Sequence, residues 1–232
     1  MRIRQDGKSS RLLVWFTWVV PLALPVLSGC VSLAKSFPDK HYYALDVTRQ
    51  GEPGVPVSGA ILDVRGLFVS PRFEGKELVY RTGDTRYESD FYNAWFVSPS
   101  AMLTQQVQNW LRNAGLFEHV VATPSYLDAT HILEGTVTAL YGDYRQQEGH
   151  KAVVGMHIVL IEDNSTRRAI VFQRDYHQVV ELTESSPDGL TRGWNQALQQ
   201  IFMALEEDLR GVDLKANNQK PASSRRLNYL RR

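Results

Sequence analysis

The sequence has 232 residues, of which 43% are hydrophobic and 22% charged, and its formal net charge is +1. Residues 30–210 hold 16 basic and 23 acidic residues, whereas residues 1–29 and 211–232 are both basic. A mildly acidic body argues against nucleic-acid binding, because phosphates require a basic surface. The single cysteine, Cys30, excludes an intrachain disulfide. A body of this length is sufficient for one domain with a substantial core.

Residues 1–29 have the organisation of a lipoprotein signal peptide. Four basic residues precede an apolar run at 12–26, and Leu27-Ser28-Gly29-Cys30 follows it. A membrane-spanning helix requires about 20 apolar residues, so this run is too short to remain as a span. We therefore predict cleavage between Gly29 and Cys30 and attachment of lipid to Cys30. The alternatives are a plain signal peptide with a coincidental cysteine, or an anchor that is never cleaved.

The lipid on Cys30 would tether the mature protein to one leaflet, because several acyl chains together anchor a protein stably. In the bacterial lipoproteins that this segment resembles, an aspartate after the cysteine commonly retains the protein at the inner membrane. Val31 occupies that position here, which favours the periplasmic face of the outer membrane. Residues 30–40 are then a short polar tether.

Two amphipathic helices are predicted, at 99–114 and 187–210. Each begins at a Ser-Pro pair, which combines a good N-cap with a good first helical residue, and each ends at a glycine, Gly115 or Gly211. Apolar residues recur at spacings of three and four in both, so Trp110 and Trp194 should be largely buried.

Alternation and β-branched or aromatic content predict several strands. We expect them at 41–47, 60–69, 77–81, 86–92, 117–121, 131–141, 151–161 and 169–182. Residues 77–92 should form a hairpin, and the last three strands an antiparallel meander whose middle strand is apolar on both faces. In the first strand of that meander, Leu133, Val137, Ala139 and Tyr141 should share one face.

The fold expected is a single α+β domain at 41–210, in which an antiparallel or mixed β-sheet packs two amphipathic helices against one face. A loop rich in proline and glycine lies at 49–59. The segment 211–232 is basic and poor in apolar residues, and we expect it to be a disordered tail.

Catalytic motifs are not evident in the sequence. It contains no glycine-rich phosphate loop, no GxSxG and no HExxH, and its six histidines lack the i, i+3 or i, i+4 spacing of helical metal ligands. Glu206-Glu207-Asp208 is interpreted as a solvated face, since consecutive helical residues point in different directions. We therefore expect a non-enzyme with no catalytic residues, no metal and no cofactor.

The aromatic residues of the predicted hairpin indicate a partner surface. Tyrosine, tryptophan and arginine are the usual anchors of protein interfaces, although strand alternation must turn part of such a cluster toward the core. The candidate residues are Tyr80, Arg81, Tyr87, Tyr92 and Trp95.

The order and spacing of several segments resemble the ABC-type transport auxiliary lipoprotein component family, to which PqiC-like lipoproteins belong. These segments are the lipobox, Tyr42-Tyr43-Ala44-Leu45, Leu78-Val79-Tyr80-Arg81, Tyr92-Asn93-Ala94-Trp95 with Pro99-Ser100-Ala101-Met102-Leu103, Gly115-Leu116-Phe117, and Ile132-Leu133-Glu134-Gly135. The resemblance covers roughly residues 30–210.

The resemblance implies a non-catalytic subunit of a lipid transport system with an MCE-domain protein and an ABC permease and ATPase. Its partners would be that system and the membrane that holds its lipid, with a homo-oligomer possible and no nucleic acid. The alternative is a lipoprotein of envelope assembly that activates a cell-wall synthase or assists an outer-membrane protein.

Overall fold

The computed structural model describes residues 39–122, 125–163 and 168–215. The strands are β1 (His41–Tyr43), β2 (Val57–Val64), β3 (Phe68–Val69), β4 (Glu77–Arg81), β5 (Tyr87–Trp95), β6 (Phe117–Val121), β7 (His131–Asp143), β8 (Lys151–Asp163) and β9 (Arg168–Glu181), and the helices are α1 (Pro99–Ala114) and α2 (Pro187–Arg210). The predicted signal peptide, lipidation site and most of the tether and of the basic tail lie outside the described residues.

Both predicted helices are confirmed at their predicted boundaries. The Ser98 hydroxyl accepts a hydrogen bond from the backbone of Ala101, and the Ser186 hydroxyl accepts one from Gly189, so each helix starts with a side-chain cap. Gly115 ends α1 in the left-handed conformation at φ 63°, where a residue without a Cβ is favoured.

The sheet is organised around β7, which has partners along both edges. On one edge it pairs antiparallel with β8, and β8 pairs antiparallel with β9, so the predicted meander is confirmed. On its other edge β2, β3 and β4 pair with it in succession, all parallel. β6 extends the sheet beyond β2, and β5 and β1 extend it beyond β4, where the predicted hairpin β4–β5 is also confirmed.

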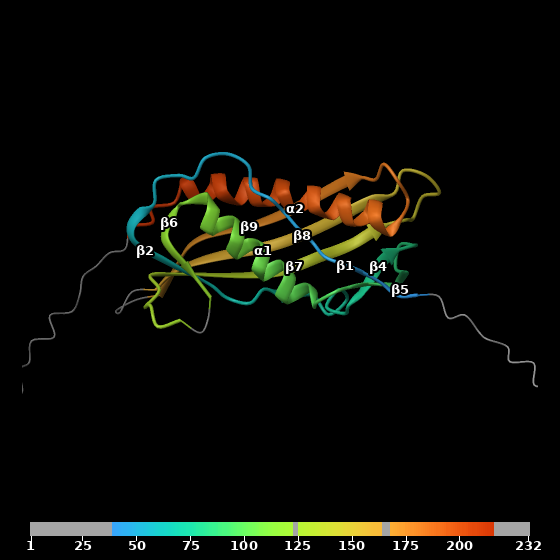
Figure 1. Cartoon of the computed structure of the whole chain (residues 1–232), viewed down its shortest axis with the longest axis horizontal. Helices are drawn as coiled ribbons and strands as arrows, with labels where there is room; N and C mark the ends of the chain where they lie inside the picture. Colours follow the sequence, from blue (N-terminus) through green and yellow to red (C-terminus); the bar gives the residue numbers. More distant parts are fainter. Residues whose placement is uncertain (1–38, 123–124, 164–167, 216–232) are drawn as a thin grey trace, which may run out of the picture. The chain divides into compact units, whose positions relative to one another are not determined.

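The helices cover one face of this mixed sheet, which confirms the predicted α+β architecture (Figure 1). α1 packs on β2, β3 and β6, and α2 packs on β8 and β9. Trp194 is fully buried and Trp110 is 3% exposed, as predicted, and the Trp110 ring lies 5.6 Å from that of Phe202 across the helix pair. The burial of these rings fixes the two helices against each other and the sheet.

An irregularity in β7 corrects the predicted alternation. The register with β8 shifts between Val137 and Ala139, so Thr138 is an extra residue and the faces exchange after it. Leu133, Val137 and Leu140 therefore point into the helix-side core. Tyr141 lies instead against Phe73 and Tyr87, at centroid distances of 5.8 and 5.7 Å.

Two predicted strands have different bounds in the structure, and β2 begins at Val57, inside the predicted loop at 49–59. The strand at 60–69 is divided into β2 and β3, because the backbone N–H of Leu67 bonds to the hydroxyl of Thr104 on α1 instead of to a strand. The strand at 41–47 ends at Tyr43, where the chain leaves the sheet.

Residues 44–56, which we call the strap, contact both helices, and in Figure 1 they are the blue segment that runs beside α1 and crosses α2. The backbone of Val47 donates to the Gln106 side chain on α1 at 2.9 Å, and the backbone of Asp46 donates to Asn195 on α2 at 3.0 Å. At its end the backbone N–H of Gly54 reaches the carbonyl of Ala114 at 2.8 Å. The strap thus satisfies its backbone with helix side chains and a helix terminus instead of a strand ladder.

The packed chain continues beyond α2. Leu214 is only 4% exposed and belongs to the core, and Val212 packs partly buried against it. The packing of side chains on the core therefore continues to Leu214, four residues past the end of α2.

Candidate partner surface

In residues 39–122, 125–163 and 168–215, no cluster of three or more His, Cys, Asp or Glu residues could hold a metal ion. Within the same ranges, neither helix is both long and apolar enough to cross a membrane.

Trp95 is part of the core, which corrects its assignment to the candidate partner surface. Its side chain is 2% exposed and its ring lies 5.0 Å from that of Trp194 on α2. Trp95 is the last residue of β5, where the strand meets the helix layer, so its indole faces the helices. The next residue, Phe96, faces outward and is 67% exposed.

Tyr80 on β4 stabilises the hairpin through contacts with Asp90 on β5 and with Tyr144. Its hydroxyl donates to the Asp90 carboxylate at 3.0 Å, and its ring meets that of Tyr144 edge to face at 5.0 Å. Asp90 also accepts hydrogen bonds from the backbone of Tyr92 and from the backbone and side chain of Asn93, where β5 departs from regular pairing with β4. Burial would raise the pKa of Asp90, but these hydrogen bonds outweigh it and hold that pKa below its ordinary value.

Tyr87 and Arg81 belong to a stacked group that we call the arginine–aromatic stack: Arg72, Phe73, Arg81, Tyr87 and Tyr141. The guanidinium of Arg81 lies 5.7 Å from the centre of the Tyr87 ring. The guanidinium of Arg72, which is on the loop before β4, lies 5.8 Å from the same ring centre. Both distances suit a cation–π interaction. Arg72 is exposed, whereas Tyr87 and Arg81 are half-buried.

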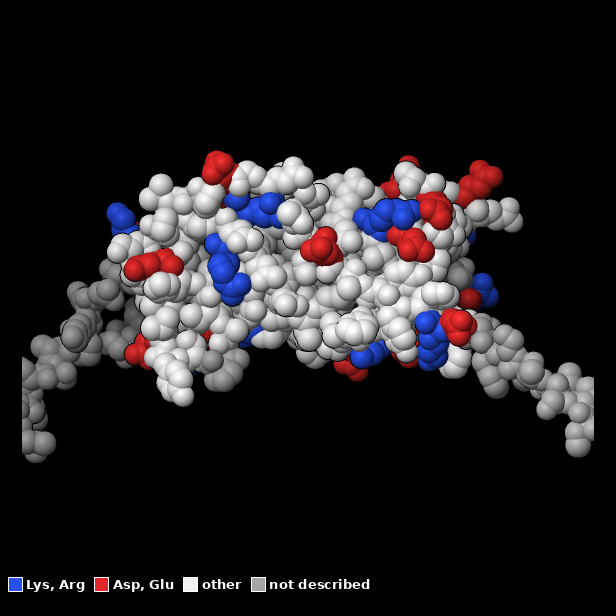
Figure 2. Space-filling model, in the orientation of Figure 1, with Lys and Arg blue, Asp and Glu red and all other residues white. Residues whose placement is uncertain are grey.

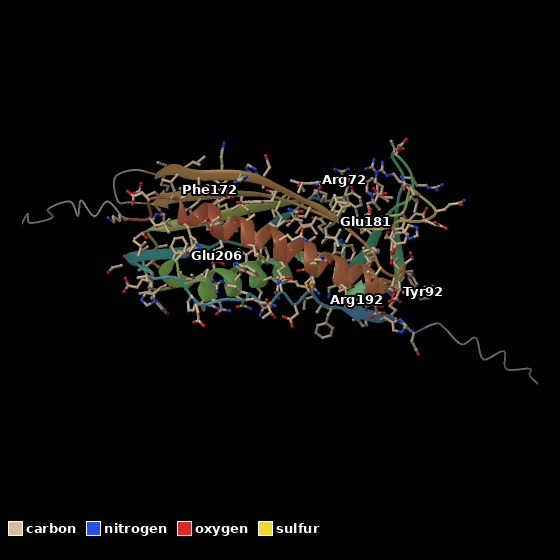
Figure 3. All side chains as sticks on the ribbon, turned by 90° about the horizontal axis from the view of Figure 1, so that it is seen from above. Arg72, Tyr92, Phe172, Glu181, Arg192 and Glu206 are labelled. Atoms are coloured by element: carbon tan, nitrogen blue, oxygen red, sulfur yellow. The ribbon has the colours of Figure 1, made fainter. Side chains whose placement is uncertain are left out.

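Tyr92 belongs to a different surface, the β1–β5 aromatic patch, which consists of the exposed side chains Tyr42, Phe91, Tyr92, Phe96 and Val97. The rings of Phe91 and Tyr92 meet edge to face at 5.2 Å, and those of Tyr42 and Phe96 meet at 6.4 Å. In Figure 3, Arg72 lies beside α2 and Tyr92 lies apart from it, beyond the right-hand end of the helix, so the two ends of the hairpin present the stack and the patch separately.

Tyr42 and Phe96 are surface residues that were not predicted from the sequence. Each is adjacent in sequence to a more buried aromatic residue, Tyr43 and Trp95 respectively. Strand alternation could have signalled this, because consecutive aromatic residues in a strand must point to opposite faces.

Glu206 is buried between the two helices and the strap, which corrects the solvated-face interpretation of 206–208. Its carboxylate accepts two hydrogen bonds from Arg49 on the strap, at 2.8 and 2.9 Å, and one from the Trp110 indole at 2.9 Å. Arg210, one turn later on α2, contacts it at 2.5 Å. The guanidinium groups and the indole satisfy both oxygens, so this carboxylate joins three segments of the chain.

The neighbouring acids of this triplet have separate environments. Asp208 pairs with Arg174 on β9 and accepts a hydrogen bond from the Tyr176 hydroxyl at 2.6 Å, so it ties α2 to the sheet. Glu207 is the exposed member of the triplet.

A hollow of about 460 Å³ opens beside Glu206, lined by Gln50, Trp110, Gln199, Met203, Glu206, Glu207 and Arg210.

Comparison with known families decides the relationship of this chain. The family model described as ABC-type transport auxiliary lipoprotein component matches residues 43–205. The chain belongs to this family. The match extends from the end of β1 to the last third of α2, so it includes the hairpin, both helices and the meander of the auxiliary domain. The resemblance inferred from the sequence is confirmed, whereas no curated protein matches the chain.

Solved structures share the fold of the auxiliary domain. Protein XCC0632 from Xanthomonas campestris, a DUF330 protein, has 18% identity and a TM-score of 0.60, covering 71% of this chain and 92% of its own. An uncharacterized protein has 19% identity and a TM-score of 0.58, with coverage of 74% and 99%. At these identities the likeness concerns the fold alone.

Proposed function

We propose that the protein is a lipid-anchored, non-catalytic auxiliary subunit of an ABC/MCE-type intermembrane lipid transport system. The observation that carries the proposal is the family match over 43–205 in a chain whose N-terminus has a lipobox. In this proposal the chain is cleaved between Gly29 and Cys30, and the lipid on Cys30 holds the domain at the periplasmic face of the outer membrane.

The arginine–aromatic stack is the surface we propose for the MCE-domain partner. Arg72 is exposed, and the rings of Phe73, Tyr87 and Tyr141 hold their positions through mutual contacts of 5.7 to 6.1 Å. A guanidinium above packed rings loses little conformational freedom when it meets a partner, and arginine and tyrosine are common interface anchors. The stack retains Arg81 and Tyr87 from the predicted surface, while Tyr80 supports the hairpin from within.

The anchor is tested by metabolic labelling of the full chain with a palmitate analogue. The wild type should take up label and fractionate with membranes, and Cys30→Ser should lose the label. Equal labelling of both proteins would refute lipidation at Cys30.

The partnership is tested by cross-linking the full chain in its native envelope, followed by identification of the captured proteins. The MCE-domain protein and the ABC components should be captured by the wild type and less by Arg72→Ala. Arg192→Ala is the matched control, because Arg192 is an exposed arginine in an ion pair with Glu184 and lies away from the stack in Figure 3. Capture of a cell-wall synthase or an outer-membrane assembly protein instead would favour the envelope-assembly alternative and refute the transport proposal.

A further inference from the structure

The β1–β5 aromatic patch is an exposed apolar surface at an edge of the sheet. β1 ends the strand order and pairs with β5 alone, so in the described part of the chain no strand covers its outer edge. Tyr42 is 58%, Phe91 65% and Phe96 67% exposed. Scattered single apolar residues are ordinary on a protein surface, whereas rings in mutual contact form a patch that needs an occupant.

The contacts place these rings on one surface. Tyr42 touches Phe96, and the ammonium of Lys40 lies 4.3 Å from the centre of the Phe91 ring. Lys40 immediately precedes β1 and Tyr42 is the middle residue of β1, so strand alternation continued back by one residue places their side chains on the same side. The two ring pairs therefore lie along one side of β1 and form a continuous strip.

The position of this strip along the chain indicates the occupant. The described chain begins at Asp39, immediately before the strip, and only residues 31–38 separate it from Cys30. About nine extended residues span at most about 30 Å. A lipid on Cys30 therefore keeps this end of the sheet within a short distance of the bilayer.

The chemistry of the strip suits the interfacial region of a bilayer. Aromatic rings concentrate at that depth because they combine an apolar body with a polar or polarisable edge, and lysine stems cover apolar surface while the ammonium remains in water. Lys76 adds a second ammonium, which donates to the Phe96 carbonyl at 3.1 Å. Asp39 and Glu77 are also exposed nearby, and acidic and basic residues are interspersed on the face shown in Figure 2.

We propose that the β1–β5 aromatic patch rests on the bilayer that holds the lipid of Cys30 and so orients the domain on the membrane. The inference rests on the lipid anchor of the proposed function. Because the charges around the patch are mixed, ring insertion into the interface and not attraction to anionic lipid supplies the affinity. Contact should therefore form on vesicles of zwitterionic phosphatidylcholine.

The fold provides a matched pair of reporter positions. Phe96 lies in the patch, whereas Ile170, which is 60% exposed, lies on β9. Ile170 pairs with Ile161 of β8, and Ile161 pairs with Ile132 near the start of β7. β4 pairs with β7 at Gly142, ten positions further along that strand, or about 33 Å at the usual rise per residue. Since Cys30 would be blocked by lipid, Phe96→Cys or Ile170→Cys would each carry a single free thiol.

The experiment uses the full lipidated chain with an environment-sensitive fluorophore on either thiol, in phosphatidylcholine vesicles that contain lipids with a quencher near the headgroup. The label at position 96 should lose intensity and shift to the blue, and the label at 170 should do neither. Equal behaviour of the two labels on vesicle-bound protein would overturn the inference. Phe91→Cys provides an independent reporter within the patch.

The readouts separate this inference from the proposed anchor. Protein that fails to float with the vesicles and lacks lipid by intact mass refutes the anchor itself. Protein that floats with lipid attached but shows no quenching at 96 and 91 refutes only the orientation. Energy transfer between labels at position 96 on two copies, without lipid quenching, would assign the patch to a homo-oligomer and also overturn the inference.

Discussion

The indole N–H of Trp110 donates a hydrogen bond to the carboxylate of Glu206 at 2.9 Å, and this contact joins α1 to α2 inside the protein. Arg49 of the strap completes the group with a bidentate pair, and the side chains of Arg49 and Glu206 are only 7% and 9% exposed. The three segments that meet here are 61 and 96 residues apart along the chain, measured between Arg49 and Trp110 and between Trp110 and Glu206. A polar group so placed is tolerated only because each of its members has a partner.

Removal of the Glu206 carboxylate should destabilise the domain strongly. Glu206→Ala leaves the buried guanidinium of Arg49 and the Trp110 indole without their shared acceptor. The expected loss is about 3 kcal/mol of unfolding free energy, since breaking one side of a buried pair strands the other charge. Urea denaturation of wild type and variant measures it. Glu207→Ala, at the exposed neighbouring position, should change stability by less than about 0.5 kcal/mol, and equal effects of both variants would contradict the structure.

The same carboxylate should make stability depend on acid. Burial would raise the pKa of Glu206, but the hydrogen bonds and charges of Arg49 and Arg210 outweigh burial and hold the pKa below its ordinary value. A carboxyl whose pKa is lower in the folded state stabilises the fold above its unfolded pKa, about 4.3, and loses this contribution as pH falls through the folded value. The stability difference between wild type and Glu206→Gln should thus be constant from pH 7 to about 5 and shrink below about 4. A difference that stays constant down to pH 3 would show that Glu206 does not titrate in this way.

Local sequence chemistry was sufficient to predict both helices. The Ser-Pro starts and glycine ends act within a few residues, and the same caps appear in the structure. The meander was also predictable, because its strands are consecutive in the chain and only a few residues separate each from the next.

Contacts between distant segments were not predictable. The parallel pairing of β2 and β4 with β7 leaves no local mark in the sequence, and neither does the ion pair between Arg49 and Glu206. An acidic triplet on a helix has the same pattern whether a strap covers it or not. The extra residue at Thr138 also escapes periodicity, since one bulge reverses every later face of the strand.

Trp95 and Tyr92, both on β5, should respond differently to replacement by alanine. Trp95→Ala empties a site against Trp194 in the core and should cost about 3 to 5 kcal/mol of unfolding free energy. Tyr92→Ala removes a ring that is 42% exposed and should change stability by only about 0.5 kcal/mol. Thermal unfolding of the two variants checks the contrast, and a strongly destabilised Tyr92→Ala would place Tyr92 in the core.

Gly115 is the position where the end of α1 meets the strap, and it should tolerate no side chain. Its φ is +63°, and a Cβ there would lie 2.9 Å from the Gly54 carbonyl oxygen and 3.1 Å from the Gly54 nitrogen. Backbone cannot yield as a flexible side chain does, so Gly115→Ala must disturb the hydrogen bond from Gly54 to Ala114 as well as occupy a left-handed conformation. We expect a loss of about 1 to 2 kcal/mol from the left-handed conformation alone, with a further loss from the clash.

Gly66→Ala is the control for this prediction, because a Cβ at Gly66 would meet no atom within 4 Å. It should change the unfolding free energy by less than about 0.5 kcal/mol in the same urea titration. Hydrogen exchange of the Gly115→Ala variant should show a local effect at Gly54. The Gly54 amide should lose protection from exchange, because its acceptor at the end of α1 is displaced. Full protection of that amide in a stable Gly115→Ala protein would mean that the strap does not depend on this close approach.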